Sequence, residues 1–211
     1  MKRSAPCVCA LFLLTGCGGE TFGGLMYHLF LPHSYRVAAE FTLGDGPLLI
    51  LVDDDWEQLT WPPARDWLID EIDKHLRQAK AVDRVFPSQK VNALRRADPK
   101  FNERSISELG KEMGAKQVLW LQVREFVATT NFDTASEAAR CTLRVKVFDP
   151  RAKSKAEMRL WPSSREGWYV TVKKSARDLI EFERDEDIAR MLITEAAEDV
   201  AKLFYDHRKP V

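Results

Sequence analysis

Two short apolar runs, Leu48 to Val52 and Val118 to Leu121, constrain the fold of this chain more than any other feature. Consecutive apolar residues would bury both faces of a strand, which is typical of central strands in a sheet that is covered on both sides. Segments with helical periodicity separate the two runs. Because helices between central strands form crossover connections, we expect these two strands to run parallel.

Start and stop signals place the helices. Pro62 and Pro63 fit only a helix entrance, where the missing backbone donor costs nothing. Ser105 and Glu108 have the spacing of a capping box, and Gly114 suits the left-handed exit of the same helix. The other expected elements are an apolar helical stripe at Leu68, Ile72, Leu76 and Ala79, a strand over 82–86, a helix over 91–96 and a final helix over 187–205.

The later half of the chain has the pattern of antiparallel strands. Residues 140–148 alternate between apolar and polar side chains, which predicts one buried face and one wet face, as in an antiparallel edge region. Two further short strands are expected over 158–161 and 168–172. We therefore predict a single α/β domain over residues 47–211, with a mixed sheet of parallel central strands, antiparallel later strands and covering helices.

The first sixteen residues are typical of an export signal. Lys2 and Arg3 precede a short apolar stretch over 8–14 that is far too short for a membrane span, which needs about 20 apolar residues. The stretch ends in Leu14-Thr15-Gly16-Cys17, which resembles the lipobox of bacterial lipoproteins. An ordinary secretory peptide with a chance cysteine is the alternative.

The lipobox resemblance implies cleavage before Cys17 and lipidation of that cysteine. In this family the cysteine sulfur carries a diacylglyceryl group with fatty acids such as palmitate, and the new amine is usually acylated. We therefore expect a membrane anchor through lipid on Cys17, followed by a lipidated tether over residues 17–46. Gly18, rather than the aspartate that retains lipoproteins in the inner membrane of enterobacteria, favours the outer membrane, facing the periplasm of the cell envelope.

Removal of the signal changes the charge and the cysteine content. Loss of 16 of the 211 residues leaves 195, with 30 basic and 32 acidic side chains. A mature chain so close to neutrality argues against nucleic acid as a partner, because nucleic-acid binders normally present a basic face. With Cys17 lipidated, Cys141 is the remaining thiol. We expect it to be a small buried hydrophobe, because it shares an apolar strand face.

Residues 47–150 also resemble the small α/β domain of several envelope proteins. These are the curli-secretion lipoprotein, the lipoprotein activators of penicillin-binding proteins and the N-terminal domain of the Tol translocation protein. The resemblance depends on the two apolar strands, on the segment from Ser105 to Gly110 followed by Gly114-Ala115, and on the strand that leads to Asp149. It implies a non-catalytic adaptor or assembly factor, with an envelope protein as partner and a homo-oligomer as a further option.

Three aspartates at the end of the first apolar run support a contrasting hypothesis. Asp53 and Asp55 would lie at the carboxyl end of a central strand, where α/β folds place their sites, and could hold magnesium or calcium for a hydrolase. Trp56 and Glu57 follow, however, where haloacid-dehalogenase-type phosphatases continue with small residues. The other interpretation is that the aspartates bind nearby backbone donors, so our main prediction includes no metal and no cofactor.

Two tryptophans near these aspartates are candidates for partner binding. Trp56 and Trp61 are expected in the loop at the strand ends, where aromatic side chains can form a protein contact, although they could equally pack in the core. Together with Asp53 and Asp55 they form the predicted partner surface, and the polar loop Thr129 to Ala139 is its second part. The four histidines have no metal-ligand spacing.

Overall fold

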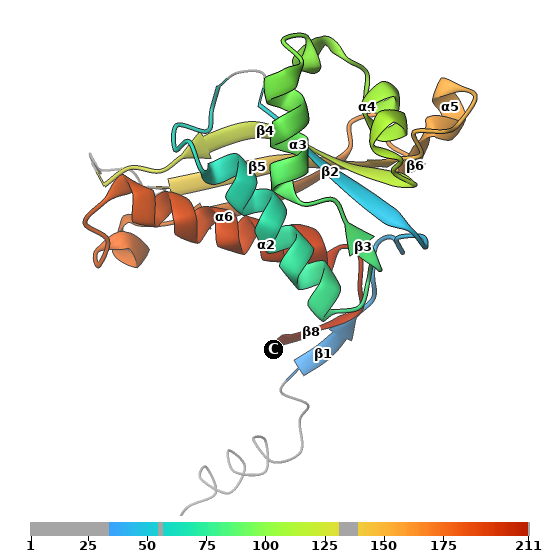
Figure 1. Cartoon of the computed structure of the whole chain (residues 1–211). Helices are drawn as coiled ribbons and strands as arrows, with labels where there is room; N and C mark the ends of the chain where they lie inside the picture. Colours follow the sequence, from blue (N-terminus) through green and yellow to red (C-terminus); the bar gives the residue numbers. More distant parts are fainter. Residues whose placement is uncertain (1–33, 55–56, 131–138, 211) are drawn as a thin grey trace, which may run out of the picture. The chain divides into compact units, whose positions relative to one another are not determined.

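The computed structural model describes residues 34–54, 57–130 and 139–210. Residues 37–207 form one compact unit on a six-stranded sheet (Figure 1). The strand order is β3-β2-β4-β5-β6, and β7 also pairs with β5. The strands are β2 (Pro47–Asp53), β3 (Arg84–Val85), β4 (Gln117–Val127), β5 (Ala139–Phe148), β6 (Arg159–Trp161) and β7 (Trp168–Lys174).

The strand directions confirm the predicted mixed sheet. β2 runs parallel to β3 and to β4, with Ile50 opposite Leu119. β4 and β5 are antiparallel, and β6 and β7 add antiparallel pairs on the other side of β5. The expectation of an edge region over 140–148 is therefore wrong, because β5 has neighbours on both sides. The face of β5 that was predicted to be wet is partly covered, because Thr142 and Arg144 are partly exposed and Lys146 is buried.

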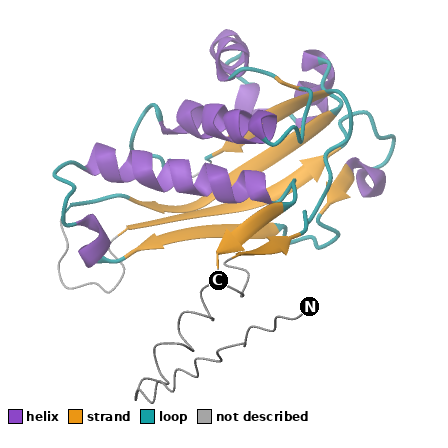
Figure 2. Cartoon of the chain, turned by 90° about the horizontal axis from the view of Figure 1, so that it is seen from below, coloured by secondary structure: helices purple, strands orange, loops and turns teal. Residues whose placement is uncertain are grey.

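Two long helices cover that first face. In Figure 2 they lie side by side across the strands. α2 (Ala64–Gln78) begins directly after Pro63, as predicted, and buries Leu68, Ile72 and Leu76. α6 (Asp185–Lys202) buries an apolar stripe against the same core. The strand residues of this core include Leu119, Leu121 and Val123 of β4 and Cys141, Leu143, Val145 and Val147 of β5.

The opposite face carries shorter elements and a smaller core. These are α3 (Ser88–Ala97), the 3-10 turn η1 (Phe101–Glu103) and α4 (Ile106–Met113). The predicted capping box at Ser105 is present, and Gly114 ends α4 with φ 71°. Gly110 lets α4 approach the chain after β5, because a Cβ there would lie 2.5 Å from Pro150 Cβ. The elements pack on Leu49, Leu51, Val118 and Phe148.

Several elements have no pattern that sequence analysis recognised. The short helix α5 (Lys155–Met158) precedes β6, and the 3-10 turn η2 (Ala176–Leu179) follows β7. β1 (Ser34–Val37) and β8 (His207–Pro210) form a separate two-stranded sheet. No helix in the described ranges is both long and apolar enough to cross a membrane. Leu43 is buried in the core of residues 37–207, and the predicted start of the domain at residue 47 stays a prediction.

Candidate binding cleft

A cleft lies between the second face of the sheet and the short elements that partly cover it. Its volume is about 420 Å³. Leu51, Trp120 and Phe148, from three neighbouring strands, line it on the sheet side. The rings of Trp120 and Phe148 meet edge to face, with centroids 6.4 Å apart. The opposite wall comes from η1, α4 and α5 and consists of Phe101, Ile106, Leu109 and Met158.

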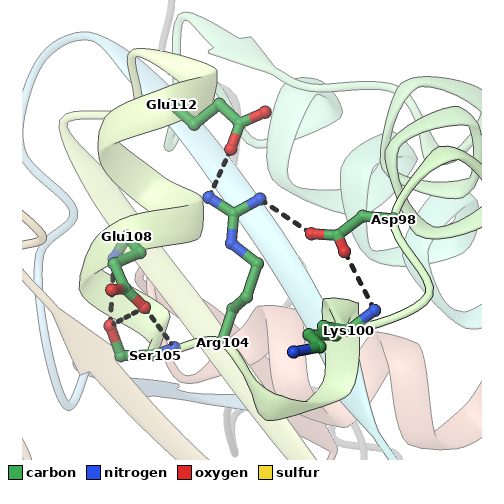
Figure 3. Close-up of polar contacts among 6 residues, drawn as sticks. All are labelled: Asp98, Lys100, Arg104, Ser105, Glu108 and Glu112. Atoms are coloured by element: carbon green, nitrogen blue, oxygen red, sulfur yellow. Dashed lines mark hydrogen bonds and ion pairs between the residues drawn. The ribbon is translucent and has the colours of Figure 1, made fainter.

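A polar network fixes the wall made by η1 and α4 (Figure 3). The Arg104 guanidinium bonds to Asp98 at 3.2 Å and to Glu112, so it ties the chain before η1 to the body of α4. The backbone N–H and hydroxyl of Ser105 donate to the Glu108 carboxylate at 2.9 and 2.8 Å, which lowers the pKa of Glu108. These contacts make the wall a defined surface.

Arg95 of α3 supplies a positive charge at the cleft. Its guanidinium carbon lies 4.8 Å from the centre of the Phe101 ring, and its Nη1 donates to Asn92 at 3.3 Å. Its Nε is buried and has no hydrogen-bond partner among the described residues. Burial lowers the pKa of Arg95 to about 10, and the nearby charge of Arg65 adds to this effect. The carboxylate of Asp53, which also lines the cleft, acts in the opposite direction.

A second group of cations lies next to the cleft, around the ring of Trp120. Arg144 and Lys146 of β5 lie 5.2 and 5.6 Å from the centre of the Trp120 ring. Arg159 of β6 is paired with Phe148, so it belongs to the same face. Lys146 is only 7% exposed, and its Nζ donates to the Arg165 carbonyl at 2.7 Å. We call Arg144, Lys146 and Arg159 the cationic patch.

Among the described residues, no acidic side chain forms an ion pair with the cationic patch. By contrast, Arg140 at the other end of β5 is 3.2 Å from Glu125. The Nε atoms of Arg144 and Arg159 are buried and lack a described acceptor. Burial, and then the charges of Arg144 and Arg159, lower the pKa of Lys146.

Gly167 fixes the position of two of these cations. Its φ is 94°, and a Cβ there would lie 2.9 Å from Arg144 Cγ and 2.9 Å from Lys146 Cε. The loop between β6 and β7 therefore packs directly on the stems of both side chains, and the glycine allows this close approach. The patch is held in place rather than extended freely into solvent.

The three aspartates have different positions. Asp54 accepts hydrogen bonds from the backbone N–H groups of Gln58 and Leu59 at 2.8 and 3.0 Å, so it organises the turn after β2. Asp53 lines the cleft, and Asp55 lies outside the described residues. Within the described ranges, no group of three or more His, Cys, Asp or Glu side chains could hold a metal ion.

Trp61, a predicted partner-binding residue, lies in the core. It is 8% exposed, its Nε1 donates to Glu186 of α6 at 3.1 Å, and its ring centre lies 6.1 Å from that of Trp67. Arg190 stacks near both rings, which leaves the Trp61 ring little free surface. Trp56 and the lipidation candidate Cys17 lie outside the described residues.

Cys141 has the buried environment that the alternation of β5 predicts. It is 1% exposed, among the apolar side chains beneath α6. Burial raises the pKa of its thiol to about 12. A thiol with so high a pKa is protonated at neutral pH and is a poor nucleophile.

Sequence reasoning missed both the cleft and the cationic patch. Alternation over residues 140–148 predicts that Arg144 and Lys146 lie on a wet strand face, but Lys146 is buried. Arg95 comes from a helix and Arg159 from a separate strand, so no local spacing connects them. The available signal was the pair of cations at i and i+2 opposite a tryptophan on the neighbouring strand, and it becomes visible only once the register Trp120 to Lys146 is known.

No known protein family and no curated protein matches this chain in sequence. Similar solved structures include a PelC dodecamer from Paraburkholderia phytofirmans, at 14% identity, covering 81% of this chain and 96% of that one, with a TM-score of 0.41. The lipoprotein GNA1162 from Neisseria meningitidis is 14% identical over 74% of this chain and 98% of that one, with a TM-score of 0.43. The hypothetical protein CT253 from Chlamydia trachomatis is 18% identical over 75% and 96%, with a TM-score of 0.42.

Proposed function

We propose that this chain is a lipid-anchored envelope protein that binds another envelope protein and catalyses no reaction. The observation that carries the proposal is the sequence Leu14-Thr15-Gly16-Cys17, preceded by Lys2, Arg3 and a short apolar stretch. After cleavage, Cys17 would hold the chain on a membrane, by our expectation the outer one, with the domain in the periplasm. Acyl chains contribute about 0.8 kcal/mol per buried methylene, so two or three chains give a stable anchor.

The arrangement of charged and apolar groups supports binding rather than catalysis. Asp54 is engaged by backbone donors, and the buried thiol of Cys141 is unsuited to nucleophilic attack. The cleft instead combines an apolar interior with cations at its edges, which is a common composition of binding surfaces. A tethered domain with such a surface would bring its partner to the membrane. The partner-binding role of Trp56 and of the loop 129–139 is part of this proposal.

Intact-mass spectrometry of the native product tests the anchor. We expect a chain that begins at residue 17 and carries added acyl mass. The Cys17→Ser variant is the matched control, because it keeps the charge and apolar stretch of the signal but lacks the sulfur that accepts lipid. An unprocessed start, or a trimmed chain without acyl mass, would contradict the proposed anchor.

Crosslinking in intact cells, followed by purification of this chain from membranes, tests the partner. We expect one envelope protein to be recovered repeatedly with the native chain, and less of it with Cys17→Ser, because tethering raises the local concentration. A homo-oligomer would appear as crosslinked copies of this chain. If neither a partner nor a second copy is recovered, the adaptor function is wrong even where the lipid is present.

A further inference from the structure

We propose that the cleft and the cationic patch bind an extended acidic segment of a partner protein, with one apolar side chain of that segment in the cleft. This inference rests on the proposed partner-binding function and specifies the chemistry of the partner. The two surfaces are continuous, because Trp120 lines the cleft and also lies beneath Arg144 and Lys146.

Uncompensated charge is the first argument. Arg144, Lys146 and Arg159 lie together on one face, and two of them have a buried Nε that no described residue accepts from. Like charges held together in a partly buried surface are costly when no opposite charge lies near them. Carboxylates from outside the chain would neutralise these charges by binding the terminal Nη groups, since the Nε atoms themselves are buried. Guanidinium groups bind carboxylates in paired hydrogen bonds, which makes this anion a good match for two arginines.

The spacing of the cations indicates an extended chain. Arg144 and Lys146 are two residues apart on one strand, so their side chains leave the same face about 7 Å apart. Acidic residues at alternate positions of an extended peptide have the same spacing. A single phosphate group would instead need donors that converge on one point, and the packing of Gly167 against both stems holds Arg144 and Lys146 at their separate strand positions. The geometry therefore favours a peptide over a phospholipid headgroup.

The cleft adds an apolar contact beside the charges. Its volume of about 420 Å³ is in the lower part of the range for ligand pockets, and Trp120, Phe148 and Phe101 give it an aromatic lining. One aromatic or large aliphatic side chain would bury most of its surface there. Such an anchor beside a charged rim is the usual composition of a binding hot spot.

A titration with a defined peptide tests the inference. The probe is fluorescein-labelled Ser-Phe-Ser-Glu-Ser-Glu-Ser, in which phenylalanine and both glutamates share one face of an extended chain. The protein is the full chain with Cys17→Ser, so that acyl groups cannot affect binding. We expect fluorescence anisotropy to show saturable binding that weakens at high salt. Moving the two glutamates to adjacent positions, or replacing phenylalanine by alanine, should weaken binding about tenfold.

Variants of the protein assign the contact. Arg144→Gln should weaken binding of the peptide about tenfold, because it removes a charge-assisted pair. Arg140→Gln is the matched control: it lies on the same strand and face and changes the charge equally, but Arg140 is already paired with Glu125. It should change affinity less than twofold. Equal loss in both variants, or no binding of the peptide, would overturn the proposal.

Vesicles distinguish a lipid from a peptide. The same Cys17→Ser chain is mixed with phosphatidylglycerol and with phosphatidylcholine vesicles. Binding to phosphatidylglycerol that Arg144→Gln abolishes, without binding of the peptide, would replace the peptide by an anionic lipid and overturn the inference. Because this chain carries no lipid, the result is independent of the mass-spectrometric test of Cys17. Failure of the anchor and failure of the peptide site are therefore separate outcomes.

Discussion

The two faces of the central sheet carry different kinds of side chain, although the same strands contribute to both. Beneath α2 and α6, the side chains of β4 and β5 are apolar and almost fully buried from one end to the other. On the opposite face, the start of β4 at Val118 and the end of β5 at Phe148 belong to a small core. The neighbouring residues on that face are Trp120, Lys146 and Arg144. The covered face provides a continuous core, whereas the other face provides a cleft and a charged surface.

This difference separates stability from binding at neighbouring residues. Leu143 and Arg144 are adjacent in sequence, yet one side chain points into the core and the other lies over Trp120. In a strand, successive side chains point to opposite faces, so one segment can serve both purposes. Substitutions on the covered face of β5 should therefore lower stability, whereas substitutions on the other face should mainly affect binding.

The largest effect is expected at Leu143, which is fully buried on the covered face. Leu143→Ala should lower the free energy of unfolding by about 2–5 kcal/mol, because it removes apolar contacts and leaves a cavity. Urea unfolding followed by tryptophan fluorescence measures the change. A loss of less than about 1 kcal/mol would indicate that this face tolerates cavities and would weaken the contrast between the faces.

Cys141 makes the covered face sensitive to high pH. Its thiol has an ordinary pKa near 9.0 and a pKa of about 12 in the fold, so above pH 9 the unfolded chain loses its proton first. Stability should therefore fall as the pH rises between about 9 and 12, by at most about 1.4 kcal/mol per unit from this group. Below pH 9 the group should contribute no pH dependence.

The Cys141→Ala variant isolates this contribution from that of lysines and tyrosines. The free energy of unfolding of both proteins is measured at pH 8 and pH 10.5. From the lower to the higher pH, the variant should lose less of this free energy than the native protein does. Equal slopes would show that solvent reaches the thiol in the folded protein. The covered face would then be less tightly packed than its burial indicates.

A smaller effect is expected at Ser105, in the wall of the cleft. Ser105→Ala removes the acceptor for the Glu108 N–H at 3.2 Å and should cost about 1 kcal/mol of stability. Ser105→Thr keeps an acceptor and should restore most of the loss. Thermal unfolding of the three proteins gives the comparison. Identical stabilities would mean that the capping box does not hold α4, and that the second face depends on other contacts.

Local patterns predicted elements on both faces of the sheet, but not how the strands pair. Apolar runs, the stripe of α2 and the capping box at Ser105 are local patterns, and each predicted its element. The central position of β5 was missed, because pairing partners cannot be read from one strand alone. Alternation predicted that Thr142, Arg144 and Lys146 of β5 are wet. This is confirmed for Thr142 and Arg144, which are partly exposed, and wrong for Lys146, which is 7% exposed.

The candidate site depends on residues that are distant in sequence. Arg95, Trp120, Arg144 and Arg159 come from one helix and three strands, and only the fold brings them together. The sequence position of Trp61 allows two interpretations, because a tryptophan near a strand end can belong to a partner surface or to the core. Its hydrogen bond to Glu186, 125 positions away, places it in the core.

The smallest effect on stability is expected at Arg144, and it gives the most direct test of the comparison. Arg144→Gln should change the free energy of unfolding by less than about 0.5 kcal/mol, because it removes no ion pair and relieves repulsion with Lys146. Urea unfolding beside Leu143→Ala compares two adjacent residues on opposite faces. A loss above about 2 kcal/mol would make Arg144 a structural residue of the second face. A small change in stability together with a loss of peptide binding would instead locate the binding surface on the open face of β5.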